Sequence, residues 1–373
     1  MKVVLFYHSL LSDWNHGNAH FLRGVVRELK ERGHEVVVYE PVEGWSLSHL
    51  IAERGTDPIE EFRHAYPGLD SIFYRVRDLD LDTALEGANA VIVHEWNDPA
   101  LIGAIGAHHK KRGGYALFFH DTHHRSVTEP EAVGAYDLSG YDGVLAYGAA
   151  IARIYKDRGW ARRVWIWHEA ADVRLFYPIE SADKDGDLVW IGNWGDEERT
   201  GELEEFLLEP ARALRLKTRV YGVRYPAHAL QALAQAGIEY GGWLPNYRVP
   251  EVFARYRVTV HIHRRPYAHA LPGIPTIRPF EALACAVPLV CSPWRDTDGL
   301  FAAGKDFLIA ADGAEMKRHL RALLDDPARA AALAAHGRAT VLRRHTTAHR
   351  VDQWLAIVRE LARGKSERLR FTG

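Results

Sequence analysis

The chain has 373 residues, of which 47% are hydrophobic and 26% are charged, a composition typical of a globular protein long enough for two domains. Its 47 lysines and arginines nearly balance its 49 aspartates and glutamates, so the net charge of -2 provides no general attraction to nucleic acid or to an acidic membrane. The two cysteines, Cys285 and Cys291, lie in apolar surroundings, which excludes a disulfide framework or zinc cluster and predicts a reducing, cytoplasmic location.

The first 172 residues alternate between strand and helix patterns. Apolar strands are predicted at 3–7, 35–39, 90–96, 115–121, 143–148 and 163–170, and helices at 21–32, at 99–112 and up to about residue 158. Near-continuous apolar strands that follow helices indicate a parallel sheet covered on both faces. This region is therefore predicted to be a doubly wound α/β domain, and its short opening run is expected to be a first strand, not a signal peptide.

A polar stretch at 177–187, "YPIESADKDGD", has no hydrophobic period, and we predict a linker at 173–187. After it the alternation restarts in a second domain, 188–346, with strands at 188–195, 218–222, 258–263 and 288–292 and helices at 200–215 and near 227–236. Residues 347–373 are predicted to form an amphipathic last helix. The fold class is thus α/β, with two tandem Rossmann-like domains expected to face each other across a ligand-binding cleft.

Glu281 lies in an apolar helical run, "LPGIPTIRPFEALACAV", at 271–287. Pro279 suits the first position of that helix, which would make Glu281 its third residue. A capping box would need Ser or Thr where Arg278 stands, and the helix dipole contributes only about 0.3–1 kcal/mol, less than burial of a charge costs. We favour a carboxylate that accepts hydrogen bonds from a ribose diol beside a phosphate on Arg278, although a favourable interaction with the helix dipole remains the alternative.

The same segment resembles a known family. "RPFEALACAVPLV" resembles the Glu-Ala-x-Ala-x-Gly-x-Pro-Val-Val signature of retaining GT-B glycosyltransferases, the superfamily that includes glycogen synthase and sucrose synthase. "VHIHRRPY" at 260–267 is similar to the strand that precedes Arg-x-Phe-Glu in the spore-maturation, CgeB-like branch. The order of elements is also similar, through "AADVRLFYP" at 170–178, "GWLP" at 242–245 and "RHTTAHR" at 344–350. The resemblance implies the GT-B fold, a nucleoside diphosphate sugar donor, no metal ion or other cofactor, and a last helix that crosses back to the first domain.

The resemblance also implies which residues bind the donor. Glu281 would hold the ribose hydroxyls, the 192–199 loop would meet the pyrophosphate, and the base slot would be formed by Gly242, Trp243 and Leu244. Thr276, just ahead of the helix, is expected to join the donor contacts. The chain departs from the family pattern at Gly273, where a glutamate usually touches the donor sugar, and at Asn193 and Arg199, where Gly-Arg and then Lys are usual. Arginine binds phosphate bidentately, so the missing cations could come from Arg199, Arg264 and Arg278.

A second group of candidates lies in the first domain. His120 and Asp121 end a predicted strand where the cleft should open, so His120 could act as a base or orient an acceptor hydroxyl while Asp121 holds its imidazole. The alternative is a pair that only caps the loop. His16, Gly17 and Asn18 are expected to approach the acceptor or the β-phosphate. Although "HDTHH" and "HIH" have metal-ligand spacing, no HExxH motif accompanies them, and no metal site is predicted.

These observations predict a metal-independent glycosyltransferase of the hexosyltransferase class. It would move a sugar from a nucleoside diphosphate to the hydroxyl of a small molecule, glycan, lipid or protein. No nucleic-acid partner is expected, and because no apolar run reaches the ~18 residues of a membrane-spanning helix, membrane contact should be peripheral at most. Two alternatives stay open: a nucleotide-sugar epimerase of the same fold, and a catalytically silent sugar-binding or glycan-binding protein. The dinucleotide motif GxGxxG is missing after both first strands, so a nicotinamide or flavin enzyme is poorly supported.

Overall fold

The computed structural model describes residues 1–180, 183–195 and 197–371, and it divides into two compact units. The first unit comprises Met1–Glu169 together with the chain from Thr347 onward, and the second comprises Ala170–Thr346. The sequence predicts a linker at 173–187, and the described parts of this segment, 173–180 and 183–187, fall within the second unit. Residues 181–182 of the predicted linker lie outside the described residues. The chain re-enters the first unit through helix α16 (Thr347–Phe371).

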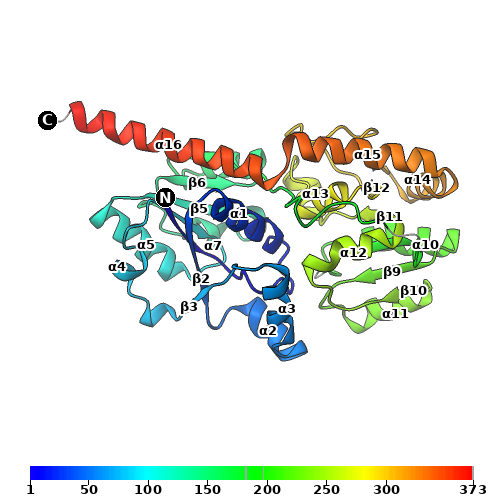
Figure 1. Ribbon diagram of the computed structural model, residues 1–373. Coiled ribbons are helices and arrows are strands. Elements are labelled where there is room, and N and C mark those ends of the chain that lie inside the picture. The colour runs from blue at the N-terminus through cyan, green and yellow to red at the C-terminus, as the bar shows by residue number, and fades with distance from the viewer. Residues whose placement is uncertain (181–182, 196, 372–373) are drawn as a thin grey trace. The chain divides into compact units, whose positions relative to one another are not determined.

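The first unit is built on a parallel sheet of seven strands in the order β3-β2-β1-β4-β5-β6-β7 (Figure 1). Its strands are β1 (Lys2–Phe6), β2 (Glu35–Pro41), β3 (Ile72–Tyr74), β4 (Ala90–His94), β5 (Ala116–Asp121), β6 (Gly143–Ala146) and β7 (Val164–Ile166). The helices between them are α1 (Ala19–Glu31), α2 (Trp45–Arg54), α3 (Asp57–Ala65), η1 (Val76–Asp78), α4 (Leu81–Ala84), α5 (Pro99–Arg112), α6 (Arg125–Thr128), α7 (Pro130–Gly134) and α8 (Ala149–Asp157). The strand order reverses between β1 and β4, so these two strands flank the topological switch point, where sheets of this kind bind ligands.

Helices pack against this sheet, which explains why its central strands β4 and β5 are apolar up to the polar residues at their carboxyl ends. Every residue of β4 and β5 is buried. The last helix, α16, packs on α1 and β5 (Figure 1), and its apolar stripe includes the fully buried Val351 and Trp354. The indole nitrogen of Trp167 donates to the carbonyl of Arg350 at 2.9 Å, which fastens this helix to the end of the sheet.

The second unit has a parallel sheet of six strands in the order β10-β9-β8-β11-β12-β13. Its strands are β8 (Gly186–Ile191), β9 (Thr218–Tyr221), β10 (Ile238–Tyr240), β11 (Tyr256–His261), β12 (Leu289–Cys291) and β13 (Leu308–Ile309). Its helices are α9 (Thr200–Leu203), η2 (Glu204–Leu208), α10 (Glu209–Leu214), α11 (Ala227–Gln235), η3 (Asn246–Arg248), α12 (Val249–Ala254), η4 (Pro266–Ala270), α13 (Ile277–Ala284), α14 (Gly313–Asp325) and α15 (Pro327–Arg344). Here the order reverses between β8 and β11, which places the second switch point there.

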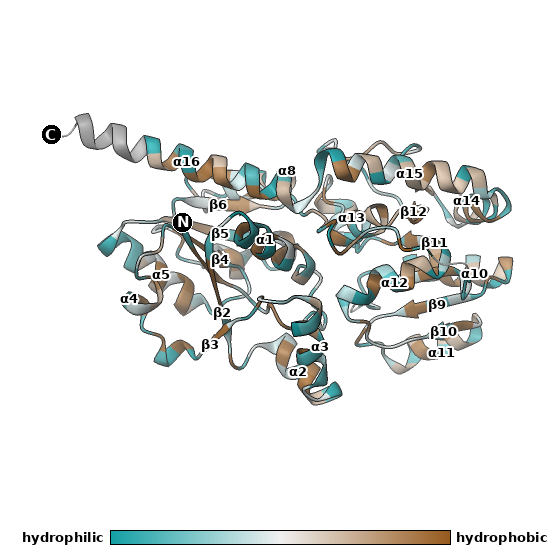
Figure 2. Cartoon of the chain, viewed as in Figure 1, coloured by the Kyte–Doolittle hydropathy of each residue, from teal (hydrophilic) through white to brown (hydrophobic). Residues whose placement is uncertain are grey.

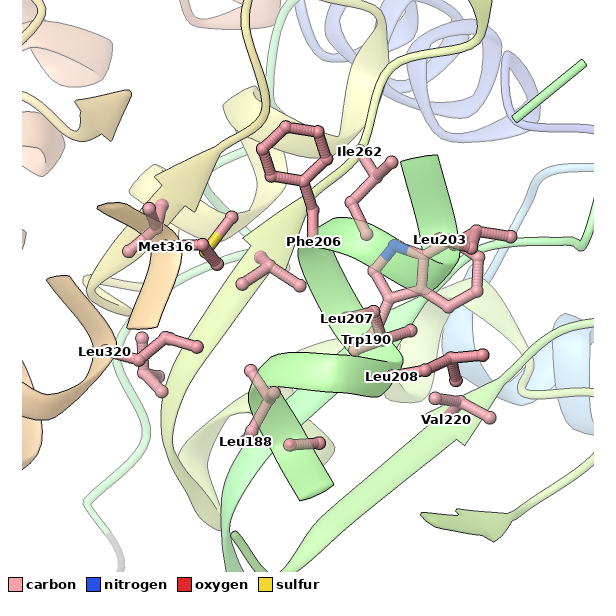
Figure 3. Packing of buried hydrophobic residues seen from close by; sticks show 14 of the residues in the cluster. Leu188, Trp190, Leu203, Phe206, Leu207, Leu208, Val220, Ile262, Met316 and Leu320 are labelled. Atoms are coloured by element: carbon pink, nitrogen blue, oxygen red, sulfur yellow. The ribbon is translucent and has the colours of Figure 1, made fainter. Parts of the chain in front are cut away.

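The core of the second unit lies between its sheet and its helices. Leu188 and Trp190 of β8 meet Leu207 of η2, and Met316 of α14 closes the cluster from the other side (Figure 3). Strand β11 carries hydrophobic residues in its centre (Figure 2). These rigid strands position the loops at their carboxyl ends, which carry the predicted donor residues.

Helix α13 differs from its prediction. It begins at Ile277, two residues earlier than expected, after Thr276 in a left-handed conformation with φ of 59°. Pro279 is therefore its third residue, which is tolerated because the first N–H groups of a helix have no intrahelical acceptor. Glu281 is the fifth residue and not the third, so it lies in the second turn. Proline has no backbone N–H to donate. The amides ahead of Pro279 in the first turn that can donate a hydrogen bond are those of Ile277 and Arg278.

Candidate functional sites at the carboxyl ends of the two sheets

Arg199 is the central cation of the second unit. It is 7% exposed; its Nη1 donates to the carbonyl of Ile262 at 2.7 Å and its Nη2 donates to the carbonyl of Asn193 at 2.5 Å. Its Nε is buried without a hydrogen-bond partner, and within the described part of the chain no carboxylate pairs with it. Burial, and then the nearby Arg264, lower the pKa of Arg199 to about 9, so it stays charged at neutral pH. A buried guanidinium without a carboxylate is costly unless an anion joins it.

Arg264 and Gly195 lie next to Arg199. A Cβ added at Gly195 would lie 3.3 Å from Nε of Arg199 and 3.6 Å from Nε of Arg264, so both guanidinium groups converge on this glycine. The φ of 88° at Gly195 also disfavours other residues. Nη1 of Arg264 donates to Glu198 at 3.1 Å. The loops after β8 and β11 thus bring two predicted donor residues together at the switch point.

Asn193 ties two of these loops together. Its side-chain oxygen accepts a hydrogen bond from the amide of Val223 at 2.8 Å, and its carbonyl accepts one from Arg199. The residue therefore shapes the loop after β8 and helps to hold Arg199. This is a positioning role, in addition to the phosphate contact that the sequence predicts.

Glu281 is fully buried and has hydrogen-bond partners within the protein. Its Oε1 accepts a hydrogen bond from Nδ2 of Asn246 at 2.6 Å, and its Oε2 is bonded to Nη1 of Arg278. The protein itself therefore provides two hydrogen-bond partners for this carboxylate: Arg278 on the same helix, and Asn246, which η3 brings in from 35 residues away. A ribose contact at Glu281 stays a prediction.

The remaining predicted donor residues lie on neighbouring loops. Gly242, Trp243 and Leu244 follow β10, and all three are half-buried. The carbonyl of Gly242 accepts a hydrogen bond from Gly222 at 2.9 Å, and Leu244 packs on the core cluster that includes Phe280 of α13. Thr276 precedes α13. These contacts connect the loop after β10 to the helix that carries Glu281, while their proposed contact with a base stays a prediction.

Two buried histidines accompany the arginines. His261 and His263 each have an Nε2 atom that is buried without a hydrogen-bond partner. His263 stacks on Trp294 with ring centroids 5.5 Å apart, and burial lowers its pKa to about 3. Both rings are therefore neutral at pH 7 and can hydrogen-bond a ligand without adding charge. The sequence motif "HIH" predicted core or cleft residues here and did not single out these two atoms.

In the first unit, His120 and Asp121 lie at the end of β5, but they do not form a pair. Nδ1 of His120 is 2.5 Å from the hydroxyl of Tyr7, whereas Asp121 accepts hydrogen bonds from Tyr155 at 2.8 Å and from the amide of His123 at 3.1 Å. Successive strand residues point to opposite faces, so Asp121 does not hold the imidazole as predicted. His120 is fully buried, and burial lowers its pKa to about 3.

Glu95, which sequence reasoning missed, lies beside Asp121. Its Oε1 accepts hydrogen bonds from the amide of Thr122 at 2.7 Å and from the hydroxyl of Thr122 at 3.2 Å. Burial raises the pKa of Glu95 well above its usual range and raises that of Asp121 to about 6, and each carboxyl influences the other. Two buried carboxyls that lie side by side favour a state in which they share a single proton. The available signal was a glutamate placed directly after the buried strand "AVIVH".

The first loop of this unit joins a group of aromatic rings. Nε2 of His16 is 3.1 Å from the carbonyl of Ser9, and its ring meets that of His8 edge-on at 4.8 Å. Asn18 donates from Nδ2 to Glu169 at 2.9 Å, and Gly17 is exposed between these two residues. His16 is thus close to the switch point of β1 and β4, whereas Asn18 is tied to the end of the unit's sheet.

Metal clusters and membrane-spanning helices are absent from the described residues. No three His, Cys, Asp or Glu side chains among them are arranged to hold a metal ion. No helix in the same part of the chain combines the length and the apolar character that crossing a bilayer requires.

Comparisons with known proteins agree with this architecture. Residues 199–356 match a family model described as "Glycosyl transferase-like". A search of curated proteins finds no significant match. The sucrose-phosphate synthase of Thermosynechococcus elongatus superposes with a TM-score of 0.65 at 13% identity, over 98% of this chain and 100% of that one. The HepE protein of Anabaena, solved with UDP and glucose, gives a TM-score of 0.67 at 14% identity over 96% and 99% of the chains.

A third structure is an α-glucosyltransferase in complex with UDP-glucose and DNA, with a TM-score of 0.69 at 12% identity over 96% of this chain and 98% of that one. All three similarities extend over both units. The chain therefore has the GT-B fold, with parallel α/β domains of seven and six strands. Residues 199–356, which match the glycosyl transferase-like family model, lie mostly in the second unit.

Proposed function

We propose that this protein is a metal-independent glycosyltransferase that moves a hexose from a nucleoside diphosphate to an acceptor hydroxyl. The observation that carries the proposal is Arg199, a buried guanidinium whose Nε has no hydrogen-bond partner and whose charge has no carboxylate partner among the described residues. It lies at a switch point of an α/β sheet, where such folds bind ligands. A bound diphosphate would supply an oxygen that accepts a hydrogen bond from Nε of Arg199. It would also supply the negative charge that balances the guanidinium.

The chemistry of transfer fits this group of cations. As the bond between the sugar and the diphosphate breaks, negative charge grows on the leaving phosphate. Arg199 and Arg264, with Arg278 and the first-turn amides of α13, would stabilise that charge without reorganisation. A metal ion is not needed for this step when several guanidinium groups are preset. Glu281 would bind the ribose hydroxyls and so place the nucleotide.

Several finer assignments belong to the same proposal. Structural relatives were solved with UDP or UDP-glucose, which supports a nucleotide-sugar donor. The similarity of residues 260–267 and 278–281 to the CgeB-like branch supports that branch within the superfamily. We propose a cytoplasmic location, in keeping with the two unpaired, buried cysteines, and no nucleic-acid partner, in keeping with the near-zero net charge.

A thermal-shift screen with UDP, GDP, dTDP, CMP and ADP tests the donor site. One nucleoside diphosphate should raise the melting temperature, since a ligand at about a hundredfold excess over its Kd stabilises the native state by about 2.7 kcal/mol. R199M should lose most of that shift while the free variant melts no lower than the parent, because a costly buried charge has been removed. E281Q should weaken the shift as well.

The matched control is R212M, an exposed arginine of the same unit that pairs with Glu204. It should keep the full shift. A parent protein that responds to no nucleotide, or an R199M variant that responds as the parent does, would contradict the proposed donor site.

A further inference from the structure

Trp96 and His8 flank the switch point of the first unit. His8 follows β1 and Trp96 follows β4, and their ring centroids are 6.4 Å apart. These are the two neighbouring strands between which the sheet order reverses. Side chains at this place are positioned to meet a ligand, as Arg199 is at the corresponding point of the second sheet.

Trp96 is held firmly and yet remains exposed. The guanidinium carbon of Arg125 lies 4.7 Å from the ring centroid on one face, and His123 meets the ring edge-on at 5.2 Å. Arg125 is fixed in turn by Glu129 at 3.0 Å and by the hydroxyl of Tyr136 at 2.9 Å. Even so, 43% of Trp96 is accessible to solvent. Because Arg125 covers one face, the accessible surface is chiefly the other face and the edges of a rigid indole.

The charges around Trp96 exclude an anionic ligand. The buried carboxyls of Glu95, which precedes Trp96 in the chain, and of Asp121 carry one negative charge between them when they share a proton, and this charge would repel phosphate or carboxylate groups. Arg125 already has an acidic partner in Glu129. Burial lowers the pKa of His8 to about 4, so its partly buried imidazole is neutral at pH 7. Arg199 in the second unit has a charge without a carboxylate partner among the described residues. The site at Trp96 and His8 instead offers a flat apolar face and a neutral hydrogen-bonding group.

We infer that the acceptor is a neutral saccharide whose ring stacks on Trp96 and whose hydroxyl groups hydrogen-bond to His8. A pyranose has an apolar face of C–H groups and a rim of hydroxyls, which matches an indole face beside an uncharged imidazole. A lipid chain would leave His8 without a partner, and a phosphorylated or acidic acceptor would meet Glu95 and Asp121. This inference rests on the proposed transferase function, because it names the acceptor of that reaction.

Saturation-transfer NMR on the full chain tests the saccharide site. The probes are maltotriose, cellotriose and mannotriose, with glucose 6-phosphate and glucuronic acid as anionic counterparts. At least one neutral trisaccharide should receive saturation, and its affinity should fall about tenfold in W96A and little in W96F, because truncating a central Trp removes most of a stacking contact. W45A changes a Trp of the same unit that is 40% exposed and lies at the start of α2, and it should bind as the parent does.

Three results would overturn the inference: no neutral trisaccharide binds, binding survives in W96A, or the anionic sugars bind better than the neutral ones. The nucleotide thermal shift separates this from the donor proposal. A W96A protein that keeps its nucleotide shift and loses the trisaccharide supports both. If the parent protein binds nucleotide and no trisaccharide, only the acceptor inference is contradicted. If it binds a trisaccharide and responds to no nucleotide, the proposed transferase function is contradicted.

Discussion

Two buried arginines show how partners distinguish a structural cation from a candidate binding cation. Arg23 is fully buried, but it pairs with Asp13 at 2.8 Å and donates to the carbonyls of Leu10 and Leu11. Arg199 donates only to carbonyls among the described residues, and its Nε has no partner. The charge of Arg23 is balanced within the protein, whereas the charge of Arg199 would be balanced when an anion binds.

His120 should make the first unit sensitive to acid. The unfolded side chain titrates near pH ~6.5, whereas burial holds the folded pKa at about 3. The unfolded state therefore binds more protons between these two values, and stability falls as the pH falls through this window. In H120Q, the loss of unfolding free energy between about pH 7 and about pH 5.5 should be smaller by about 1 kcal/mol.

Urea unfolding of the parent and H120Q at both pH values measures this difference. H64Q, which changes an exposed histidine of α3, is the control and should follow the parent. Equal acid sensitivity of H120Q and the parent would show that the imidazole of His120 does not stay neutral in the folded state.

At the scale of elements, the position of α13 depends on a glycine in α15. A Cβ at Gly337 would lie 2.6 Å from the carbonyl oxygen of Asp306 and 2.6 Å from Cδ2 of Leu283 in α13. Asp306 is itself buried and accepts hydrogen bonds from His336 at 2.6 Å and Thr340 at 2.8 Å, both in α15. The helix that carries Glu281 is thus packed at close range against a helix that admits no side chain at this point.

G337A should destabilise the protein by about 1–3 kcal/mol, because an added methyl group overpacks this contact. G103A is the matched control, since Gly103 also lies within a helix, α5, and an added Cβ meets nothing within 4 Å. That change should leave stability unchanged or raise it by up to about 1 kcal/mol. Urea midpoints of both variants check the pair, and a G337A protein as stable as G103A would refute the close packing of α13 on α15.

Some elements could be predicted to the residue and others could not. Helix α5 has the predicted bounds of 99–112, because Asp98 caps it, Pro99 begins it and Gly113 ends it with φ of 61°. Helix α13 begins two residues early, because the left-handed Thr276 carries no recognisable start signal. The short strands β3, β10 and β13 lie at or near sheet edges and have two or three residues each, too few to show a period.

At the scale of the whole molecule, strand order brings the candidate residues together. Parallel strands and a reversal of order place His8 with Trp96 in one unit and Arg199 with Arg264 in the other. The second pair could be predicted from the sequence through its resemblance to GT-B glycosyltransferases. The bond between Asn246 and Glu281 could not, since it joins side chains 35 residues apart through packing. Glu95 was missed for the same reason, because only its burial beside Asp121 makes it unusual.

The most direct measurement is a crystal structure of the full chain grown with the nucleoside diphosphate that stabilises it most. The account predicts a phosphate oxygen within hydrogen-bonding distance of the Nε of Arg199 and ribose hydroxyls against Glu281. A nucleotide that binds elsewhere, with Arg199 left as it is now, would contradict the account.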